Sequence, residues 1–588
     1  MHVLATAGHV DHGKSTLVRS LTGMEPDRWA EERRRGLTID LGYAWTTLPT
    51  GEQLAFVDVP GHERFIGNML AGLGPAPGVL FVVAADEGWA RQSDDHLAAI
   101  DALDLRRGLL AVTRSDLAEP TATIGESLDR IKRSSLGDIE AIPVSGVTGA
   151  GLNELRRALS RLVARLPPPD QAAPVRLWVD RAFTVRGSGT VVTGTLAAGS
   201  IGLGDTLLLR DRKVVVRGVQ SLGAASERVG AVARIAVNLR GVAADEVGRG
   251  DVLSAPGRWH RTEQIDVRLV GDRIDVRAGL VLHIGTAALP VHIRPLGDDT
   301  ARLTLPCALP LRAGDRGVLR DPSRHSIAGG VLVLDADPPA LRRRGAAQRR
   351  ADELGRATGR PDLEAEVARR GAVRVAHLVE LGVTVDDTTT VGGWLVSDEQ
   401  RHNWTARAPE LVRGWAERHR LEPAMPLSAL AKALELPDDA LLELVLAGTD
   451  LVVADGRASG AVVTPNPADA AISAVERRLR DAPFDAPDRN DLAALGLGRR
   501  EVAAAERDGR LLRLDADIVL LPDAPELALA ALRGLEQPFT ASQARQALHT
   551  TRRVCIPVLE YLDRAGATVR LDGQLRSVAD RSATALGR

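Results

Sequence analysis

The chain has 588 residues and a formal net charge of −2, which is long enough for several domains and excludes a polycation that binds nucleic acid over its whole surface. Its two cysteines, Cys307 and Cys555, lie far apart and form no metal-ligand pattern, which fits a reducing compartment. No stretch approaches the roughly 20 apolar residues of a membrane span, and the first apolar run starts too early to leave room for a signal peptide. We therefore expect a cytoplasmic protein with no membrane partner.

The first element is an apolar run at residues 3–5, which predicts a strand, followed by Gly-His-Val-Asp-His-Gly-Lys-Ser at residues 8–15. This segment fits the phosphate-binding loop pattern of Gly, four residues, Gly-Lys-Ser, and residues 16–19 continue it in helical register. Backbone N–H groups at such a helix N-terminus face a polyphosphate. We expect Lys14 to reach the β- and γ-phosphates and Ser15 to bind Mg²⁺. The chain has only four lysines, so a lysine kept at this position indicates that a compact charge is needed there.

The next apolar run, at residues 54–58, predicts a buried strand that ends in a carboxylate and continues as Val-Pro-Gly-His-Glu. Asp58 is expected to hold Mg²⁺ through water, the Gly61 N–H to contact the γ-phosphate, and His62 to orient the attacking water. Upstream, the segment Arg-Gly-Leu-Thr-Ile-Asp at residues 35–40 offers the Thr38 hydroxyl as a second Mg²⁺ ligand, in a segment ordered only when the γ-phosphate is present. The expected catalytic residues are therefore Lys14, Thr38, Gly61 and His62.

Two further strands, at residues 109–112 and 141–144, lead into loops that can read the nucleotide base. Asp116 could accept hydrogen bonds from guanine N1 and N2, donors that adenine lacks, and the loop at Ser145 supplies an N–H for the guanine carbonyl. The residues expected to bind GTP or GDP are Gly8, His9, Val10, Asp11, His12, Gly13, Lys14, Ser15, Thr16, Asp58, Gly61, Thr113, Arg114, Asp116 and Ser145.

Residues 58–63 and 35–39 resemble the switch signatures of the translational GTPases. The base-reading motif of that family is usually Asn-Lys-X-Asp, and this chain has Thr113 and Arg114 at its first two positions. The departure leaves Asp116 intact, leaves the contribution of position 113 open, and argues against an ordinary elongation factor Tu.

Strands and helices alternate as far as the stiff Leu-Pro-Pro-Pro-Asp linker at residues 166–170, which predicts a doubly wound α/β domain over residues 1–168. Short strands with regular Gly punctuation follow and predict two all-β barrels, at residues 174–258 and 260–338. Residues 187–194 resemble the signature strand of the second domain of translational GTPases.

Helical periods with short strands dominate from residues 342–344 onward. Pro426, Pro483 and Pro538 begin similar units at nearly equal spacing, each with two helices and then a short hairpin, which is the order of a winged helix. The predicted winged helices are residues 345–402, 403–467, 468–524 and 525–580. The predicted fold class is thus multidomain: an α/β P-loop GTPase domain, two all-β barrels, and tandem α+β winged-helix domains. A scaffold that binds nothing remains an alternative for the winged helices.

The last unit carries the strongest nucleic-acid signal. Thr550 or Thr551 can cap a helix whose first turn holds two arginines, where helix-turn-helix proteins contact nucleic acid. Two further arginines flank the hairpin at residues 571–574, a candidate wing. The expected RNA contacts are Arg545, Arg552, Arg553, Arg570 and Arg576; the alternative for each is a solvated side chain.

Residues 5–14, 35–44 and 552–563, together with the order of the parts, resemble the bacterial selenocysteine-specific elongation factors of the SelB type. The resemblance implies a monomeric carrier of selenocysteinyl-tRNA that uses GTP and Mg²⁺, binds an mRNA hairpin beside a UGA codon, and hydrolyses GTP on the ribosome. It also implies a pocket of Tyr43, Asp180, Arg181 and Arg234 that could read the charge of a selenolate, the alternative being a salt bridge on the barrel surface.

Two other functions remain open. Another translational GTPase, such as an initiator-tRNA or general elongation factor, is disfavoured by the winged-helix tail. A GTP-sensing regulator that reads duplex DNA is disfavoured by the barrels and by the acidic residues that run through the tail.

Overall fold

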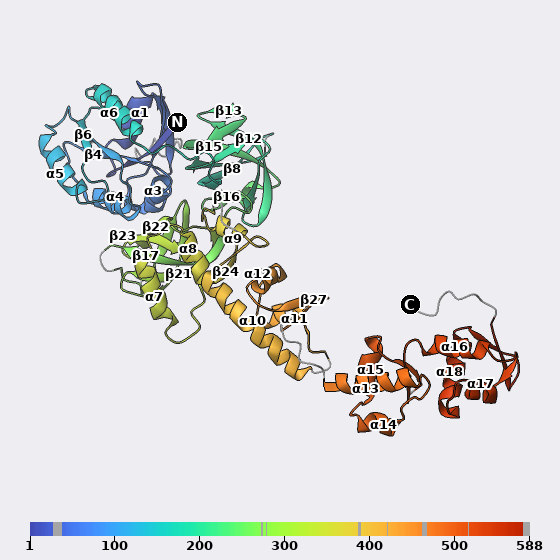
Figure 1. Cartoon of the computed structure of the whole chain (residues 1–588). Coiled ribbons are helices and arrows are strands. Elements are labelled where there is room, and N and C mark those ends of the chain that lie inside the picture. The colour runs from blue at the N-terminus through green and yellow to red at the C-terminus, as the bar shows by residue number, and fades with distance from the viewer. Residues whose placement is uncertain are drawn as a thin grey trace. The chain divides into compact units, whose positions relative to one another are not determined.

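The computed structural model describes residues 1–26, 38–187, 189–271, 274–277, 279–385, 390–419, 422–460, 467–515 and 517–579. The chain divides into two compact units, Met1–Leu395 and Val396–Arg588, and each is described by itself. In Figure 1 the colour runs from blue through green to yellow along the first unit and from golden yellow to red along the second.

The first unit begins with a six-stranded sheet in the order β2-β3-β1-β4-β5-β6, in which only β2 is antiparallel to its neighbour. Its strands are β1 (His2–Ala7), β2 (Gly42–Thr47), β3 (Gln53–Asp58), β4 (Val79–Ala84), β5 (Gly108–Thr113) and β6 (Glu140–Pro143). Its helices are α1 (Lys14–Thr22), η1 (Glu63–Phe65), α3 (Ile66–Leu73), α4 (Arg91–Ala102), α5 (Thr121–Ile131) and α6 (Leu152–Ala164).

Two hydrophobic cores cover the two faces of this sheet. Helices α3, α4 and α5 pack on one face, and α1 and α6 pack on the other. The central strand β4, Val-Leu-Phe-Val-Val-Ala, is buried at every position, as expected for a parallel strand with helices on both sides. In α6, Leu152, Leu155, Leu159 and Leu162 recur every three or four residues and are buried, which fixes the face that the helix turns to the sheet.

The chain then forms a closed barrel. Its strands pair in the order β11-β16-β7-β9-β15-β12, and β12 pairs back onto β11. The strands of this domain are β7 (Arg176–Trp178), β8 (Arg181–Val185), β9 (Gly189–Leu196), β10 (Ser200–Gly202), β11 (Thr206–Leu209), β12 (Arg212–Ser221), β13 (Ala224–Ser226), β14 (Arg228–Gly230), β15 (Ala233–Arg240) and β16 (Val252–Ser254), with the turn η2 (Ala244–Glu246).

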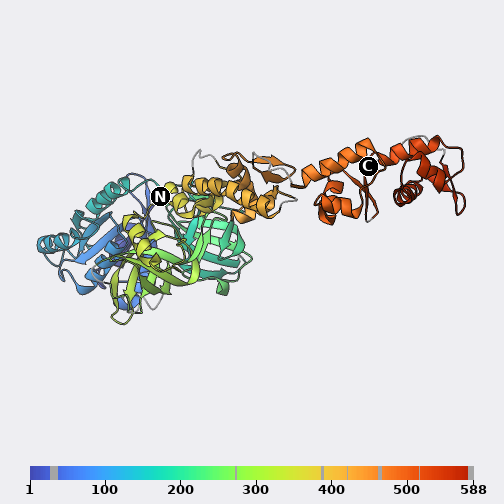
Figure 2. The same cartoon turned by 60° about the horizontal axis from the view of Figure 1, so that its bottom comes forward.

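The second all-β domain is a seven-stranded antiparallel sheet in the order β19-β18-β22-β23-β17-β21-β20. Its pairings in the described residues leave β19 and β20 as edges, so it forms a half-barrel. Its strands are β17 (Arg261–Val270), β18 (Val281–Ile284), β19 (Ala287–Pro290), β20 (His292–Pro295), β21 (Thr300–Pro310), β22 (Arg316–Asp321) and β23 (Ser326–Asp335). In the described part between β7 and β23 no α-helix interrupts the green ribbons of Figures 1 and 2.

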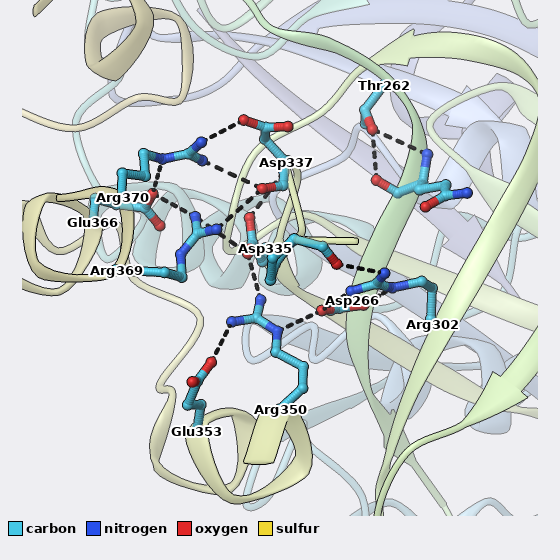
Figure 3. A network of polar contacts seen from close by, with 12 residues as sticks. Thr262, Asp266, Arg302, Asp335, Asp337, Arg350, Glu353, Glu366, Arg369 and Arg370 are labelled. Carbon is cyan, nitrogen blue, oxygen red and sulfur yellow. Dashed lines mark hydrogen bonds and ion pairs between the residues drawn. The ribbon is translucent and has the colours of Figure 1, made fainter. Parts of the chain in front are cut away.

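A helical segment follows and is fastened to this sheet by buried ion pairs (Figure 3). Asp266 of β17 is fully buried and accepts from Arg302 Nε at 2.7 Å and from Arg350 Nε at 2.7 Å, and Arg350 also pairs with Asp335. Arg350 thus holds its helix against the half-barrel. The elements of the segment are α7 (Ala346–Arg356), α8 (Leu363–Arg370), β24 (Ala372–Arg374), α9 (Val375–Glu380) and β25 (Trp394–Val396).

The second unit begins with the long helix α10 (Asp398–Arg418), capped by the Ser397 side chain. The elements that follow are β26 (Met425–Pro426), α11 (Leu427–Ala433), η3 (Asp439–Leu441), α12 (Leu442–Leu446), β27 (Val452–Ala454), β28 (Arg457–Ser459), α13 (Pro467–Asp481), α14 (Arg489–Ala494), α15 (Arg499–Arg507), β29 (Leu512–Asp515), β30 (Ile518–Leu520), α16 (Ala524–Arg533), β31 (Phe539–Thr540), α17 (Ala541–Ala547), α18 (Arg552–Arg564), β32 (Thr568–Arg570) and β33 (Leu575–Val578).

These elements give the helices and hairpins expected of winged helices. One boundary differs from the sequence prediction, because α10 runs without a break through position 402/403. We propose to move that boundary to a point before Ser397, where the side-chain cap begins the helix. In the last two winged helices a single hydrophobic core joins residues from α13 to α18, which explains why the two repeats pack as a pair.

No helix in the described ranges is both long enough and apolar enough to cross a membrane.

Candidate functional site

The phosphate-binding loop lies between β1 and α1, and the predicted strand–loop–helix order is confirmed. Gly8 has φ +129°, and a Cβ there would lie 2.1 Å from the carbonyl oxygen of Val82, so only glycine lets the loop pass β4. Gly13 adopts a left-handed conformation just before Lys14 and turns the chain into the helix. Strand packing and two glycines therefore shape the loop.

Lys14 is buried, and its Nζ donates to the carbonyl oxygens of Gly8 at 2.9 Å and His9 at 2.7 Å. Burial lowers the pKa of Lys14 to about 8, against the opposing influence of the Asp58 and Asp11 carboxylates. The ammonium group is thus held inside the loop, where its partners in the described residues are oxygens.

Three oxygen donors meet at the end of β3 and the start of α1. Ser15 Oγ lies 2.9 Å from Thr38 Oγ1 and donates to Asp58 Oδ2 at 2.6 Å. Neighbouring ligands of an octahedral Mg²⁺ with bonds of about 2.1 Å stand about 3 Å apart, so this donor set fits the ion. Thr6, which sequence reasoning missed, donates to the other Asp58 oxygen at 2.7 Å and orients the carboxylate. The rest of the segment that precedes Thr38, Arg35-Gly36-Leu37, lies outside the described residues.

The segment after β3 approaches the loop from the other side. A Cβ on Gly61 would lie 2.4 Å from Lys14 Nζ and 2.6 Å from the Val10 nitrogen, so glycine is required for this close approach. His62 Nδ1 accepts from the Arg64 N–H at 3.2 Å and caps the short helix η1. Gly61 therefore stands beside Lys14, and His62 follows it directly.

The base-reading segment shows what Thr113 does in place of asparagine. Thr113 Oγ1 donates to the carbonyl oxygens of His12 at 2.7 Å and Val83 at 3.3 Å, so it ties β5 to the phosphate-binding loop. Arg114 pairs with Glu87 at 2.6 Å and reaches the Asp11 carbonyl oxygen. Asp116 is exposed at the end of the segment.

The loop that follows β6 is folded by its own serine. Ser145 is buried, and its Oγ accepts from the N–H groups of Val147 at 3.3 Å and Thr148 at 3.0 Å. The side chain therefore shapes the loop whose backbone is expected to meet the guanine carbonyl.

Two residues of α4 support the phosphate-binding loop and carry no sequence signal. The Gly8 N–H donates to His96 Nδ1 at 3.2 Å, and the Val10 N–H donates to Gln92 Oε1 at 3.1 Å. Burial lowers the pKa of His96 to about 3, so the ring is neutral and can accept. His12 is also fully buried, and burial lowers its pKa to about 4.

A second cluster lies between the α/β domain and the closed barrel, and it brings together all four predicted pocket residues. Asp180 is buried and accepts from Arg234 Nη2 at 2.8 Å and from the Tyr43 hydroxyl at 3.4 Å. The Arg234 guanidinium carbon lies 3.7 Å from the centre of the Tyr43 ring and that of Arg181 lies 5.4 Å from it. Thr193 Oγ1 adds a further hydrogen bond to Asp180 at 2.7 Å.

The protonation states of the side chains in this cluster depend on their burial and on the charged groups beside them. Burial disfavours the cation of Arg234, but the neighbouring Asp180 and Tyr43 outweigh it and raise the Arg234 pKa. Burial raises the pKa of Tyr43, so its hydroxyl stays protonated and can donate. Arg181 pairs with Asp40 at 2.9 Å.

The cluster borders a cavity of about 240 Å³. Arg181, Arg234 and Tyr43 line it together with apolar side chains that the sequence did not reveal, namely Trp45, Phe183 and Leu222. The Arg181 Nε–H is buried and has no hydrogen-bond partner in the described residues. The cavity thus combines apolar walls with two arginine side chains, which suits a small anionic group.

In the last winged helix, the arginines expected to contact RNA differ from one another in their exposure and partners. Arg552 and Arg553 lie in the first turn of α18, which begins after Thr551 as predicted, although the Thr551 side chain makes no capping hydrogen bond. The Arg552 side chain is exposed and forms no hydrogen bond or ion pair with the described residues, whereas Arg553 Nη2 donates to the Ala486 carbonyl oxygen at 2.6 Å. Arg570 is exposed, and its side chain donates to the backbone oxygens of Asp572 and Gly573 in its own hairpin.

Arg576 does not flank the wing as an available cation. It is 6% exposed, and its Nε pairs at 3.0 Å with Asp563 of α18, so this side chain points inward. We therefore withdraw Arg576 from the candidate RNA contacts. Arg545, in the last turn of α17, is half-buried, and its side chain has no hydrogen bond or ion pair to the described part of the chain.

The chain matches two families of known proteins. Residues 1–165 match the Elongation factor Tu GTP binding domain, and residues 530–575 match the winged helix of Elongation factor SelB. The first match makes the chain a translational GTPase, which uses GTP, GDP and Mg²⁺, and it agrees with the predicted fold class.

Similarity to selenocysteine-specific elongation factors extends over the full length. The factor of Desulfomicrobium baculatum is 31% identical, with 98% of this chain and 100% of the relative covered, and that of Escherichia coli K12 is 33% identical over 76% of this chain and 75% of the relative. The crystal structure of a bacterial selenocysteine-specific elongation factor, EF-Sec, superposes with a TM-score of 0.74 at 25% identity and covers 98% of this chain and 100% of that one. The chain therefore belongs to the family of bacterial selenocysteine-specific elongation factors.

Proposed function

We propose that the chain carries selenocysteinyl-tRNA to the ribosome at in-frame UGA codons, in the cytoplasm and in its GTP-bound state. The last winged helix binds an mRNA hairpin beside the codon, and GTP hydrolysis on the ribosome releases the tRNA. The names of the full-length relatives and the match of residues 530–575 support this proposal.

The observation that carries the substrate assignment is that two arginines, Arg181 and Arg234, line the cavity beside Tyr43. A selenol is more acidic than a thiol or a hydroxyl, so the selenocysteine side chain is largely an anion at neutral pH. A buried donor on a cation favours an anion over a neutral group, because its hydrogen bond is charge-assisted in a low-dielectric site. The cavity can therefore separate selenocysteine from serine on the same tRNA.

The position of this cavity supports a dependence on GTP. Asp40 lies two residues after Thr38, and it pairs with Arg181 at 2.9 Å and with Arg249 at 2.5 Å. Arg181 also donates to the Leu41 carbonyl oxygen. A movement of the Thr38 segment after loss of the γ-phosphate would break these contacts and alter the cavity.

The hydrolysis step follows from the residues around the phosphate-binding loop. Lys14 neutralises charge on the β- and γ-phosphates, the Gly61 N–H contacts the γ-phosphate, and His62 orients the attacking water once the ribosome places it. Ser15, Thr38 and Asp58, the last through water, would hold Mg²⁺, and the ion would supply further positive charge near the transferred phosphoryl group. The guanine base of the nucleotide is bound by Thr113, Arg114, Asp116 and the loop at Ser145.

For the mRNA hairpin, the remaining candidates are Arg552, Arg545 and Arg570. Arg552 is the strongest because it stands exposed at a helix N-terminus, where a phosphate is favoured and where helix-turn-helix proteins make contacts. Arg553 holds the previous winged helix instead, so its contribution to RNA binding is expected to be indirect.

The proposal is tested by GTP-dependent binding of the full chain to selenocysteinyl-tRNA and to seryl-tRNA with the same tRNA body. We expect tight binding of the selenocysteinyl form only, and a loss of that preference in Arg181→Ala. Arg217→Ala, an exposed arginine of the same barrel, is the matched control and should bind as the unmodified chain does. Equal binding of both tRNAs would place specificity in the tRNA body and overturn the cavity assignment.

A further inference from the structure

A compact group of histidines and carboxylates, none of which belongs to the two sites already described, lies where helix α9 meets the half-barrel. His377 and Glu380 stand three residues apart on α9, so their side chains share one face of the helix. His260 comes just before β17, and its N–H donates to the Glu380 carbonyl oxygen at 3.1 Å. This backbone hydrogen bond places the histidine from the sheet beside the two residues of the helix.

The three side chains converge. His260, His377 and Glu380 each offer one ligand atom, and these atoms all lie within 4.8 Å of one another. His377 Nδ1 is 3.8 Å from Glu380 Oε2, and the two imidazole rings meet edge to face with centres 5.1 Å apart. In the described ranges no other trio of His, Cys, Asp or Glu meets this spacing.

The second nitrogen of His377 is already oriented. His377 Nε2 lies 2.9 Å from Asp337 Oδ2, and Arg370 Nη1 holds the same carboxylate at 2.6 Å (Figure 3 shows the Arg370–Asp337 pair). Asp337 therefore fixes the proton on Nε2 and leaves the Nδ1 lone pair on the side of Glu380. Histidines that bind metals nearly always donate their other N–H to a carboxylate or carbonyl in this way.

We propose that His260, His377 and Glu380 bind a divalent transition-metal cation, with Zn²⁺ as the best match, and that Asp337 is the carboxylate that orients His377. Two imidazoles and one carboxylate suit Zn²⁺, whereas Mg²⁺ prefers oxygen ligands alone. Bonds of about 2.0–2.2 Å require the ligand atoms to stand about 3.3 Å apart. The observed 3.8 Å between His377 Nδ1 and Glu380 Oε2 closes to that value by side-chain rotation.

The three ligands are 23%, 27% and 33% exposed for His260, His377 and Glu380, so the ion can enter from solvent and a water can complete its coordination. Because one ligand belongs to the half-barrel and two belong to α9, the ion would fasten the first helical segment after the barrels to the half-barrel. This fastening does not depend on the nucleotide or tRNA.

The test is a titration of the full chain, first stripped with EDTA, with Co²⁺ in excess Mg²⁺ so that the Ser15–Thr38 site does not contribute. We expect one equivalent of Co²⁺ with the visible absorption of four-coordinate nitrogen and oxygen ligation, displaced by Zn²⁺, and a higher melting temperature with Zn²⁺. His260→Ala and His377→Ala should each weaken binding at least tenfold, and Asp337→Asn, which keeps all three ligands, about 10- to 100-fold.

His292→Ala removes an exposed histidine of the same half-barrel and should bind Co²⁺ as the unmodified chain does. Absence of saturable Co²⁺ or Zn²⁺ binding in the unmodified chain would overturn the proposal, whether or not the variants fold. Binding that survives unchanged in both His260→Ala and His377→Ala would also overturn it, because the ion would then lie elsewhere.

Discussion

The nucleotide site and the last winged helix both contain residues chosen from sequence, but the fold treats the two sets differently. At the nucleotide site, glycines and backbone groups shape the phosphate-binding loop, and the residues of that loop follow one another in sequence. In the last winged helix the candidates are arginines, and two of them are engaged in contacts within the protein. Arg576 pairs with Asp563, and Arg553 donates to the Ala486 backbone. A backbone motif therefore predicts its own geometry, whereas an arginine takes its role from the partner that folding brings to it.

The largest expected effect is at His62, and this substitution tests the nucleotide site. His62→Ala should lower ribosome-stimulated GTP hydrolysis by about 10²- to 10⁴-fold, the usual contribution of a group that orients or activates the nucleophile. GTP affinity should stay the same, because the predicted phosphate contacts come from the loop and Lys14. Single-turnover hydrolysis with and without ribosomes measures the effect, and full stimulated turnover in the variant would remove His62 from the mechanism.

The next effect concerns an arginine whose ion pairs lie inside the protein. Arg350→Ala leaves the fully buried Asp266 and the buried Asp335 with one partner fewer and should lower the free energy of unfolding by about 3 kcal/mol or more. Arg349→Ala, its exposed neighbour on α7, should change it by less than about 0.5 kcal/mol. Denaturant unfolding of both variants checks this, and equal stabilities would show that the buried network of Figure 3 does not hold α7 in place.

A third effect is a pH dependence of nucleotide binding. The pKa of Lys14 is about 8 in the free chain, and a bound polyphosphate must raise it, so binding takes up a proton above pH 8. GTP affinity should therefore be flat below about pH 7.5 and should fall by up to about tenfold per pH unit above pH 8. Calorimetric titration at pH 7 and pH 9 measures it, and equal affinities would show that Lys14 stays charged throughout.

The smallest effect distinguishes an exposed arginine side chain, unpaired in the described residues, from one that is buried in an ion pair. Arg552→Ala should reduce the slope of log affinity against log salt for the mRNA hairpin by about 1, with no change in melting temperature, since it removes one exposed cation. Arg576→Ala should lower the melting temperature instead, because it leaves Asp563 without its partner. An unchanged RNA affinity and salt slope in Arg552→Ala would remove α18's first turn from the interface.

The sequence predicted the local parts of the molecule well. The strand before the phosphate-binding loop, the carboxylate at the end of β3, the proline linker and the change to short strands all depend on residues within a few positions of one another. The α/β, all-β and winged-helix order followed from these patterns.

Long-range contacts were the part that sequence could not supply. Gln92 and His96 support the loop from more than 80 positions away, and Thr113 ties β5 to His12 across 101 positions. Periodicity marks Gln92 and His96 only as residues of an amphipathic helix. That Asp180 and Arg234 share one pocket was expected from resemblance alone, and their ion pair was not expected, because nothing in either segment points to the other.

The most direct test of the charge-reading cavity compares two nearly isosteric side chains on one tRNA. The GTP-bound chain is titrated with selenocysteinyl-tRNA and with cysteinyl-tRNA carried on the same tRNA body at pH 7, where the selenol is an anion and the thiol is largely neutral. The account predicts clearly tighter binding of the selenocysteinyl form, with the difference lost in Arg181→Ala. Equal affinities for the two tRNAs in the unmodified chain would contradict it.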